Sequence, residues 1–400
     1  MHICLITSSR VFEIVFGGEE KFTKSLGEWL LNRGQKVTIV GRKLFGVEVV
    51  RGPYDASRVV DSKIKTTHPR LLQLPYPMFM LSMLVTSLLF VLRILAVNRE
   101  SRISVIHAQD TGYGGLAAVL SAKLLRVPVI LSSHGLRYFT IGNALKGVYA
   151  SLSLPWEYWL DVFTSKHADL IINVSSSGEE FFAKIGLENR KMRMIPIGID
   201  TSVSNETEKV RLTVRKKLGV HNEILIGFIG RLAPEKNLLT LLEAFVRALR
   251  LTDKMKLILV GAGPMEGKLK MLSHDRGLDD VIIFAGIRHD IDRLLSAIDV
   301  FTLPSYTEGC PTSLLEAIAS GKAVIASNIP SIREIVNHDE EALLVDPYNV
   351  EELEQAILSL YNDPELRAQM GRRAREKARI YDADSVYKRL LSLYEELVSH

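Results

Sequence analysis

The chain repeats one local pattern in both halves: a short run of β-branched residues, a turn, and then a stretch with helical spacing. Continuous apolar strands that alternate with helices are typical of a parallel sheet with helices on both faces. Two such series predict an α/β chain of two doubly wound domains. The expected strands are HICLIT, KVTIV, SVIHA, VPVILSS and DLIINV in the first half, and EILIGFIG, MKLILVG, VIIFAG, DVFTLP, AVIAS and ALLVD in the second.

Length and polarity place the domain boundary. The chain has 400 residues, which exceeds one ordinary domain and suits two. The apolar segment IPIGID gives way to the polar stretch TSVSNETEKVR, so we place one domain at 1–203 and the other at 204–380. Residues 381–400 are expected to form a further helix at the C-terminus.

The charge is divided unevenly between the halves. Residues 1–200 hold 24 Lys and Arg against 16 Asp and Glu, whereas residues 201–400 hold 26 against 30. A basic half is typical either of solvated surface charge or of contact with an anionic partner, such as a membrane surface or an acidic substrate. The basic residues are spread out without interleaved aromatic residues, which argues against nucleic-acid binding.

One uncharged stretch, residues 71–92, is long enough to span a bilayer. Pro75 and Pro77 shorten its helical part and Arg93 interrupts it, so we favour a helix over 71–97 that is buried in the protein or laid on a membrane surface. The aromatic segment 135–163 leaves the same two possibilities open. It is either part of the domain core or an interfacial segment, and its candidate interfacial residues are Trp156, Tyr158 and Trp159.

The N-terminal segment and the cysteines both favour a cytoplasmic protein. The N-terminal run MHICLIT has no basic region before it and is interpreted as a strand rather than a signal peptide. Cys4 and Cys310 are isolated from each other in the sequence, which excludes a disulfide framework and a zinc knuckle and fits a reducing compartment.

Two cations follow the first strand of the second half. Arg231 and Lys236 lie in GRLAPEKN, directly after EILIGFI. Ligands of open α/β sheets bind beyond the carboxyl ends of the strands. There a forked guanidinium and an ammonium suit a diphosphate. The alternative is an exposed basic loop that binds nothing.

Two carboxylates follow the strand DVFTLPS. Glu308 and Glu316 lie in EGCPTSLLEAIASG, where Pro311 marks the start of a helix whose free N–H groups suit a phosphate. Paired carboxylates suit the vicinal hydroxyls of a ribose or hexose. Glu316 stands among apolar neighbours, so a plain position on a helix surface explains it poorly.

The first half offers weaker candidates. The loop Gly17-Gly18 precedes a helix, where glycines let backbone N–H groups approach an anion. His134 ends the strand VPVILSS and can hydrogen-bond a sugar hydroxyl or a phosphate. A plain turn and a structural histidine are the alternatives, and His107 has the same ambiguity with less support.

Together these motifs resemble the retaining GT-B glycosyltransferases of glycosyltransferase family 4, the group 1 transferases. The strongest element is the pair of glutamates with seven residues between them, and GRLAPEKN is the second; GGEE, SSHG, IPIGID and LVGAGP are weaker. The resemblance covers most of the chain. It implies the GT-B fold, two Rossmann-like domains that face a central cleft, with the last helix returning to the first domain.

The resemblance also implies roles. Arg231 and Lys236 would hold the diphosphate of a nucleotide-sugar donor, and Glu308 would contact the transferred sugar. Glu316 would hold the ribose hydroxyls, and His134 would contact the donor sugar beside the reacting carbon. No metal and no further cofactor are expected, because the two cations and a helix dipole replace a metal and no DxD motif lies in a suitable loop. Further donor contacts are expected from Gly17, Gly18, Gly309, Thr312, Ser313 and Leu314.

Two positions depart from the family pattern: Ile197 replaces the Asn of IPNGID, and Asn237 replaces a glycine after the lysine. The hypothesis is a retaining hexosyltransferase that uses a UDP- or GDP-sugar. Its acceptor would be a hydroxyl of a lipid-linked glycan, glycolipid or polysaccharide, and the enzyme would associate peripherally with the inner face of an anionic membrane. A nucleotide-sugar epimerase of the same architecture and a non-catalytic nucleotide-sugar-binding protein are the alternatives.

Overall fold

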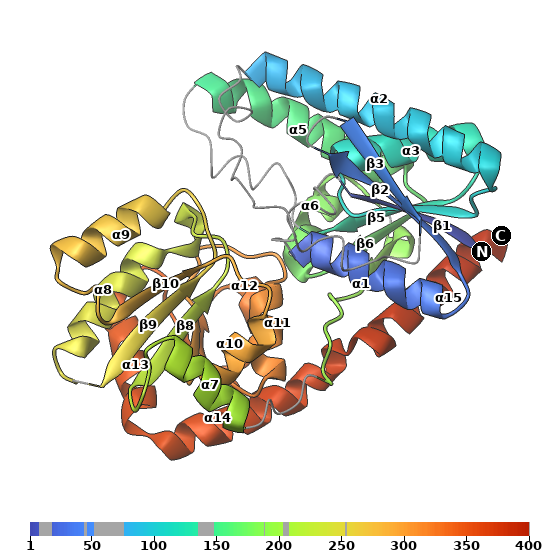
Figure 1. Cartoon of the computed structure of the whole chain (residues 1–400). Coiled ribbons are helices and arrows are strands. Elements are labelled where there is room, and N and C mark those ends of the chain that lie inside the picture. Colours follow the sequence, from blue (N-terminus) through green and yellow to red (C-terminus); the bar gives the residue numbers. More distant parts are fainter. Residues whose placement is uncertain are drawn as a thin grey trace. The chain divides into compact units, whose positions relative to one another are not determined.

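The contacts of the chain divide it into two units. A computed structural model describes residues 1–7, 18–43, 46–51, 76–134, 148–187, 189–202, 208–252 and 254–399 (Figure 1). Contacts divide the chain at Pro196 and Ile197: one unit comprises Met1–Pro196 with Val386–His400, and the other comprises Ile197–Ser385. Residues 203–207, which hold the boundary expected from the sequence, lie outside the described ranges. We call these the first and second units.

The first unit is built on a seven-stranded sheet of order β3-β2-β1-β4-β5-β6-β7. Its strand order reverses between β1 and β4, so the loops after these two strands begin side by side. All neighbouring strands are parallel except β3, which pairs with β2 in antiparallel fashion. The strands are β1 (His2–Thr7), β2 (Lys36–Lys43), β3 (Gly46–Arg51), β4 (Val105–Ala108), β5 (Val129–Ser133), β6 (Leu170–Asn173) and β7 (Met192–Met194).

The antiparallel edge strand corrects the expectation of an all-parallel sheet. Only two residues separate β2 from β3, and a parallel neighbour needs a crossover of a dozen residues or more. So short a connection permits only a hairpin.

Helices cover both faces of this sheet. Helix α3 packs against α2 and α5 on one face, and α1 lies with α15 on the other (Figure 1). The helices of this unit are α1 (Gly18–Asn32), α2 (Tyr76–Glu100), α3 (Tyr113–Leu125), α5 (Val148–His167), α6 (Glu179–Lys184) and α15 (Ala383–Ser399), with 3₁₀ turns η2 (Ser176–Gly178) and η3 (Asn189–Lys191).

The last helix is tied into the first unit by aromatic side chains. Helix α15 begins in the second unit, and its residues from Val386 onward belong to the first. The buried Tyr387 meets Phe22 and Trp29 of α1 edge to face. Further along, the buried Tyr394 hydroxyl lies 2.6 Å from a ring nitrogen of His107 in β4.

The second unit is an all-parallel six-stranded sheet of order β10-β9-β8-β11-β12-β13. Its order reverses between β8 and β11, and ligands of doubly wound sheets bind at such a switch point. The strands are β8 (Ile224–Ile229), β9 (Met255–Val260), β10 (Ile282–Gly286), β11 (Val300–Leu303), β12 (Ala323–Ser327) and β13 (Ala342–Val345).

Helices also pack in pairs around this second sheet: α8 against α13, α7 against α10, and α11 against α14. The apolar stripe of α8 shows why: Leu241, Phe245 and Ala248 recur with helical spacing and are all fully buried. The helices are α7 (Glu208–Lys217), α8 (Leu238–Leu249), α9 (Glu266–Asp275), α10 (Ile291–Ala297), α11 (Thr312–Ala319), α12 (Pro330–Arg333), α13 (Val350–Asn362) and α14 (Pro364–Ala378), with 3₁₀ turns η4 (Pro234–Lys236) and η5 (Arg379–Tyr381).

Candidate functional site

The loops that follow β8 and β11 meet at the switch point of the second sheet. Lys236 Nζ donates to Glu308 Oε1 at 2.6 Å, and the Ser305 hydroxyl donates to the same oxygen at 2.6 Å. The backbone N–H of Tyr306 donates to the carbonyl of Glu235 at 2.9 Å. The structure therefore brings together a cation and a carboxylate that lie 72 residues apart in the sequence.

The two cations of this loop differ in how firmly they are held. The Lys236 side chain is 18% exposed and its partner Glu308 is 7% exposed, whereas Arg231 is 62% exposed. Arg231 pairs with Glu235 four residues further along. Exposed pairs of this kind are weak. Lys236 is thus a fixed charge, and Arg231 is free to turn toward an anion.

Asn237 connects this loop to two neighbouring loops, and its conformation explains one departure from the family pattern. Its backbone is left-handed, with φ 55°, a conformation in which glycine and asparagine are the least strained residues. The buried side-chain amide donates to the carbonyls of Pro304 at 3.1 Å and Pro347 at 2.6 Å. Asparagine therefore keeps the turn that glycine allows and adds two bonds to neighbouring loops.

The helix that carries the second glutamate begins at the same edge. Helix α11 starts after Pro311, so the N–H groups of Thr312 and Ser313 belong to its first turn and have no acceptor within the helix. The N–H of Leu314 already donates to the Pro311 carbonyl at 3.0 Å, and its side chain is buried. Glu316 is half-buried one turn further in, and Gly309 is half-buried in the turn after Glu308.

Glycines bring a third loop close to this edge. A Cβ on Gly261, at the end of β9, would lie 2.0 Å from the Gly230 carbonyl oxygen, and one on Gly263 would lie 2.3 Å from the carbonyl oxygen of Leu232. No side chain fits at such distances. The LVGAGP segment therefore needs its glycines to pack on the loop that carries Arg231.

The second departure from the family pattern is Ile197, whose contact with the glutamate loop is made by its backbone. Ile197 is buried, and its backbone hydrogen-bonds Cys310, which lies within the glutamate loop two residues after Glu308. Burial raises the pKa of the Cys310 thiol to about 12, so this cysteine is a neutral packing residue. A contact made by the main chain does not require the asparagine that the family usually has here.

In the first unit, His134 directly follows β5. Its Nε2 lies 3.0 Å from Oε1 of Gln109, the residue after β4, and its ring meets Phe22 edge to face. Burial lowers the pKa of His134 to about 4, so the ring is neutral at pH 7. Among the residues that the structure describes, none is a hydrogen-bond partner of its buried Nδ1. The sequence did not point to Gln109, although its place directly after a strand was visible.

His107 has both ring nitrogens occupied, by the Tyr394 hydroxyl at 2.6 Å and the Ser132 hydroxyl at 2.8 Å. Burial is the main cause that lowers its pKa, to about 3. It is a structural histidine. Gly18 is the first residue of α1, and Gly17 lies outside the described residues.

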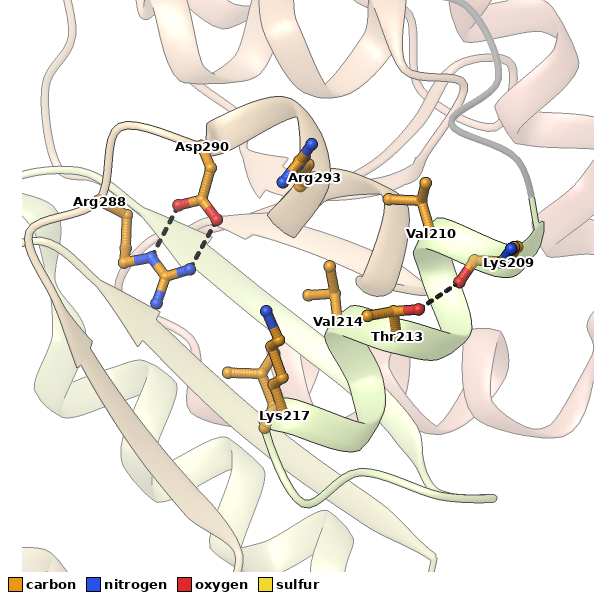
Figure 2. A pocket seen from close by; sticks show the side chains of 9 residues that line it. Lys209, Val210, Thr213, Val214, Lys217, Arg288, Asp290 and Arg293 are labelled. Carbon is orange, nitrogen blue, oxygen red and sulfur yellow. Dashed lines mark hydrogen bonds and ion pairs between the residues drawn. The ribbon is translucent and has the colours of Figure 1, made fainter.

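A pocket of about 300 Å³ lies elsewhere on the second unit, between α7 and the loop that joins β10 to α10 (Figure 2). Lys209, Lys217, Arg288 and Arg293 give it a basic rim, and Arg288 holds both oxygens of Asp290 at 2.8 and 2.6 Å. None of the residues that the sequence predicted for the site lines it. Within the described part of the chain, no cluster of three or more His, Cys, Asp or Glu could hold a metal ion.

Comparison with known proteins decides the family. The model of Glycosyl transferases group 1 matches residues 210–377, and that of Glycosyltransferase Family 4 matches residues 16–203. The chain belongs to the group 1 glycosyltransferases of family 4. The family resemblance found in its motifs is confirmed, and this glycosyltransferase carries the Lys236–Glu308 pair in the part matched by the group 1 model.

Named relatives of the glycosyltransferase act on lipid-linked acceptors. It is 29% identical to the N,N'-diacetylbacillosaminyl-diphospho-undecaprenol alpha-1,3-N-acetylgalactosaminyltransferase of Campylobacter jejuni, over 70% of this chain and 74% of that one. It is 27% identical to the UDP-Gal:alpha-D-GlcNAc-diphosphoundecaprenol alpha-1,3-galactosyltransferase of Escherichia coli, over 75% and 77%. A GDP-mannose-dependent phosphatidylinositol monomannoside mannosyltransferase of Mycobacterium tuberculosis is 30% identical, over 52% and 56%.

Solved structures confirm the GT-B fold of the glycosyltransferase. HepE of Anabaena in complex with UDP has a TM-score of 0.74 at 19% identity, covering 99% of this chain and 100% of that one. Sucrose-phosphate synthase of Thermosynechococcus elongatus has a TM-score of 0.78 at 21% identity, covering 100% and 99%. The prediction of two Rossmann-like domains is therefore confirmed.

Proposed function

We propose that the enzyme transfers a hexose from a UDP- or GDP-sugar, with retention, to a hydroxyl of a lipid-linked acceptor. The observation that carries this proposal is the Lys236–Glu308 pair at the switch point of the second sheet. Relatives named for UDP-galactose and GDP-mannose support both donor classes.

The donor diphosphate would lie against Arg231 and Lys236. There the diphosphate would compete with two carboxylates for the cations. Arg231 is paired with Glu235 of its own loop, and Lys236 is paired with Glu308 of the β11 loop. Diphosphate carries more charge than one carboxylate, so it draws both cations toward itself. Thr312 and Ser313 would add N–H groups at the helix start, together with Gly309, and Glu316 would accept from the ribose hydroxyls.

The charged side chains of the site would then promote the transfer step. As the bond between the anomeric carbon and the diphosphate breaks, the two cations stabilise the negative charge that the leaving group gains. The Glu308 carboxylate stabilises the positive charge on the sugar ring. The acceptor hydroxyl attacks from the side that the diphosphate leaves, a phosphate oxygen takes its proton, and the configuration is retained. We expect turnover to persist in EDTA, because protein cations take the place of a metal.

An apolar surface supports a lipid-linked acceptor. On α2, the side chains of Leu81, Val85, Leu88 and Leu92 recur every three or four residues and are 49–62% exposed. Leu120 and Leu124 of α3, which packs against α2, are exposed as well. Contiguous exposed apolar area of this kind is typical of a membrane or protein contact.

Charge favours a membrane for this surface. Helices α2 and α3 together carry three basic residues, Arg93, Arg99 and Lys123, and one acidic residue, Glu100. By length and composition Leu81–Glu100 is apolar enough to cross a membrane, but its other side packs in the core through Phe90 and Ile94. We therefore propose that α2 lies on the surface of an anionic membrane, at its inner face in the cell.

Product analysis tests the proposal. Purified enzyme is mixed with undecaprenyl-diphospho-N-acetylglucosamine in vesicles and with UDP-galactose, UDP-N-acetylgalactosamine or GDP-mannose in turn. We expect one donor to give a lipid-linked disaccharide with an α linkage by NMR. A β-linked product would contradict retention, and an isomerised nucleotide sugar formed without acceptor would instead indicate an epimerase.

A further inference from the structure

Two tyrosine rings stack on each other at the surface of the second unit. Tyr306 lies in the loop after β11, and Tyr348 lies in the loop after β13. Their ring centroids are 5.0 Å apart, and the planes of the two rings differ by 27°. Tyr306 is 38% exposed and Tyr348 is 78% exposed. A ring that is covered on one face by its neighbour and is still so exposed presents its other face to solvent.

The backbone beneath both rings is held by one buried side chain. The amide of Asn237 donates to the carbonyl of Pro304, two residues before Tyr306. It also donates to the carbonyl of Pro347, directly before Tyr348. The loops that carry the two rings are therefore tied to each other before any ligand arrives. Such preorganisation reduces the ordering that binding would otherwise require.

The stacked pair borders the proposed donor site. Tyr306 precedes Glu308 by two residues in the same loop. Its N–H donates to the carbonyl of Glu235 at 2.9 Å, and the carboxylate of Glu235 pairs with Arg231. A ligand on the rings would therefore lie beside the side chains that we propose to bind and activate the donor.

An exposed pair of aromatic rings suits the face of a sugar ring. The face of an aromatic ring carries partial negative charge. A pyranose presents C–H groups with partial positive charge on its face, while its hydroxyl groups point outward at its rim. Thr307 and Asp346 are exposed and lie within two residues of the tyrosines in the chain. A hydroxyl and a carboxylate at these positions can hydrogen-bond the hydroxyl groups of a sugar.

The exposure of the rings indicates which sugar they take. The sugar that is transferred must be sheltered from water, because water competes with the acceptor for the anomeric carbon. A sugar that only anchors the substrate has no such need. We infer that Tyr306 and Tyr348 form a stacking platform for a sugar of the acceptor glycan that does not itself react. The inference rests on the proposed function, which supplies a glycan acceptor beside this surface.

Binding of free oligosaccharides tests the platform without a donor and without turnover. The full chain is labelled with ¹³C in its tyrosine rings, and Tyr306→Phe and Tyr348→Phe assign the two NMR signals. Maltotriose, mannotriose and triacetylchitotriose are added in turn at millimolar concentration. We expect at least one of them to shift both signals and to leave the signal of Tyr361, a half-buried tyrosine of α13, unchanged. If no trisaccharide moves the two signals, the inference is overturned.

Other ligands that could cover the rings give different results. A shift of Tyr348 with UDP alone would indicate a nucleobase, and a shift with UDP-glucose but not with UDP would indicate the transferred sugar. A shift with phosphatidylglycerol vesicles would indicate a membrane contact. Any of these results without a shift by a trisaccharide would overturn the assignment to an acceptor glycan.

Variants separate stacking from folding. Tyr348→Ala removes the outer ring and should weaken trisaccharide binding about tenfold, whereas Tyr348→Trp, which keeps a stacking surface, should retain it. Tyr361→Ala removes a tyrosine ring elsewhere in the same unit and should not change binding. Equal binding by wild type and Tyr348→Ala would overturn the inference.

Kinetics then relate the platform to the acceptor. Tyr348→Ala should raise the Michaelis constant of a lipid-linked acceptor that carries two sugars about tenfold. The constants of the donor and of an acceptor that carries one sugar should stay the same, because neither places a second sugar on the rings. An equal rise for both acceptors would contradict the assignment to a sugar that does not react. If no nucleotide sugar is turned over, the proposed function fails, while the trisaccharide result still decides whether the rings bind a sugar.

Discussion

Lys236 of the β8 loop donates to the carboxylate of Glu308 in the β11 loop at 2.6 Å, and both side chains are largely buried. A buried cation that is paired in this way is held in place but is also neutralised by its partner. The pair therefore has two parts that substitution can separate: the position of the cation and the charge that it offers to a donor.

Glu308→Gln should separate donor binding from turnover. The amide leaves Lys236 uncompensated, so the affinity for the donor diphosphate should stay the same or rise. Turnover should fall about 100-fold or more, because the carboxylate no longer stabilises the positive charge on the sugar. Steady-state kinetics with the active donor measure both effects. Glu351→Gln, which removes an exposed partner of Arg247 in the same unit, should change neither.

Asn237 should contribute to stability through both its backbone and its side chain. Asn237→Gly keeps the left-handed turn but removes the donor to the Pro304 and Pro347 carbonyls, which should lower the unfolding free energy by about 1–3 kcal/mol. Asn237→Ala adds backbone strain of about 1 kcal/mol. Urea unfolding should rank wild type above Gly and Gly above Ala. A glycine variant as stable as the wild type would show that the two bonds contribute nothing.

Acid should destabilise the first unit before its carboxylates are protonated. Burial lowers the pKa of His134 to about 4 and that of His107 to about 3, whereas both titrate near 6.5 in the unfolded chain. Between pH 6.5 and 4 the unfolded chain therefore binds protons that the folded chain does not. As the pH falls through this range, the unfolding free energy of the protein should therefore fall by up to about 1.4 kcal/mol per pH unit for each histidine. Unfolding at pH 7.5, 6.5 and 5.5 measures this, and a flat profile below pH 6.5 would contradict it.

The α2 surface should bind anionic vesicles. We expect the enzyme to float with vesicles that contain phosphatidylglycerol, to bind pure phosphatidylcholine less, and to be released in part by salt. Leu88→Ser with Leu92→Ser removes two exposed leucines and should weaken binding about tenfold or more. Leu212→Ser, which changes a leucine of α7 that is 57% exposed in the other unit, should not weaken it. Equal flotation of all three proteins would remove the membrane proposal.

Local pattern predicted most of the fold. Helix α11 begins directly after Pro311, where the sequence places a helix start, and α8 follows the loop after β8, as the alternation of strands and helices predicts. Helix α5 was harder to predict. It contains Pro155 within a run of aromatic and apolar residues that has no clear helical period, and in the structure it packs on α3.

The candidate site was predictable only in part. Arg231, Lys236 and Glu308 could be placed at one sheet edge because each follows a buried strand. Their pairing could not, because it depends on β8 and β11 being neighbours, and nothing local to either strand encodes that order. Gln109 was missed for a similar reason: its importance comes from His134, whose strand is its neighbour in the sheet.

We expect Lys236 to hold the diphosphate of the donor. Isothermal titration compares wild type with Lys236→Ala, using whichever of UDP-glucose, UDP-galactose or GDP-mannose binds. The variant should bind the donor at least about tenfold more weakly, as expected for the loss of a charged hydrogen bond. It should also melt at a lower temperature, because Glu308 loses its largely buried partner, so the titration is made below that temperature. Equal donor affinity in folded Lys236→Ala protein would show that Lys236 does not hold the diphosphate.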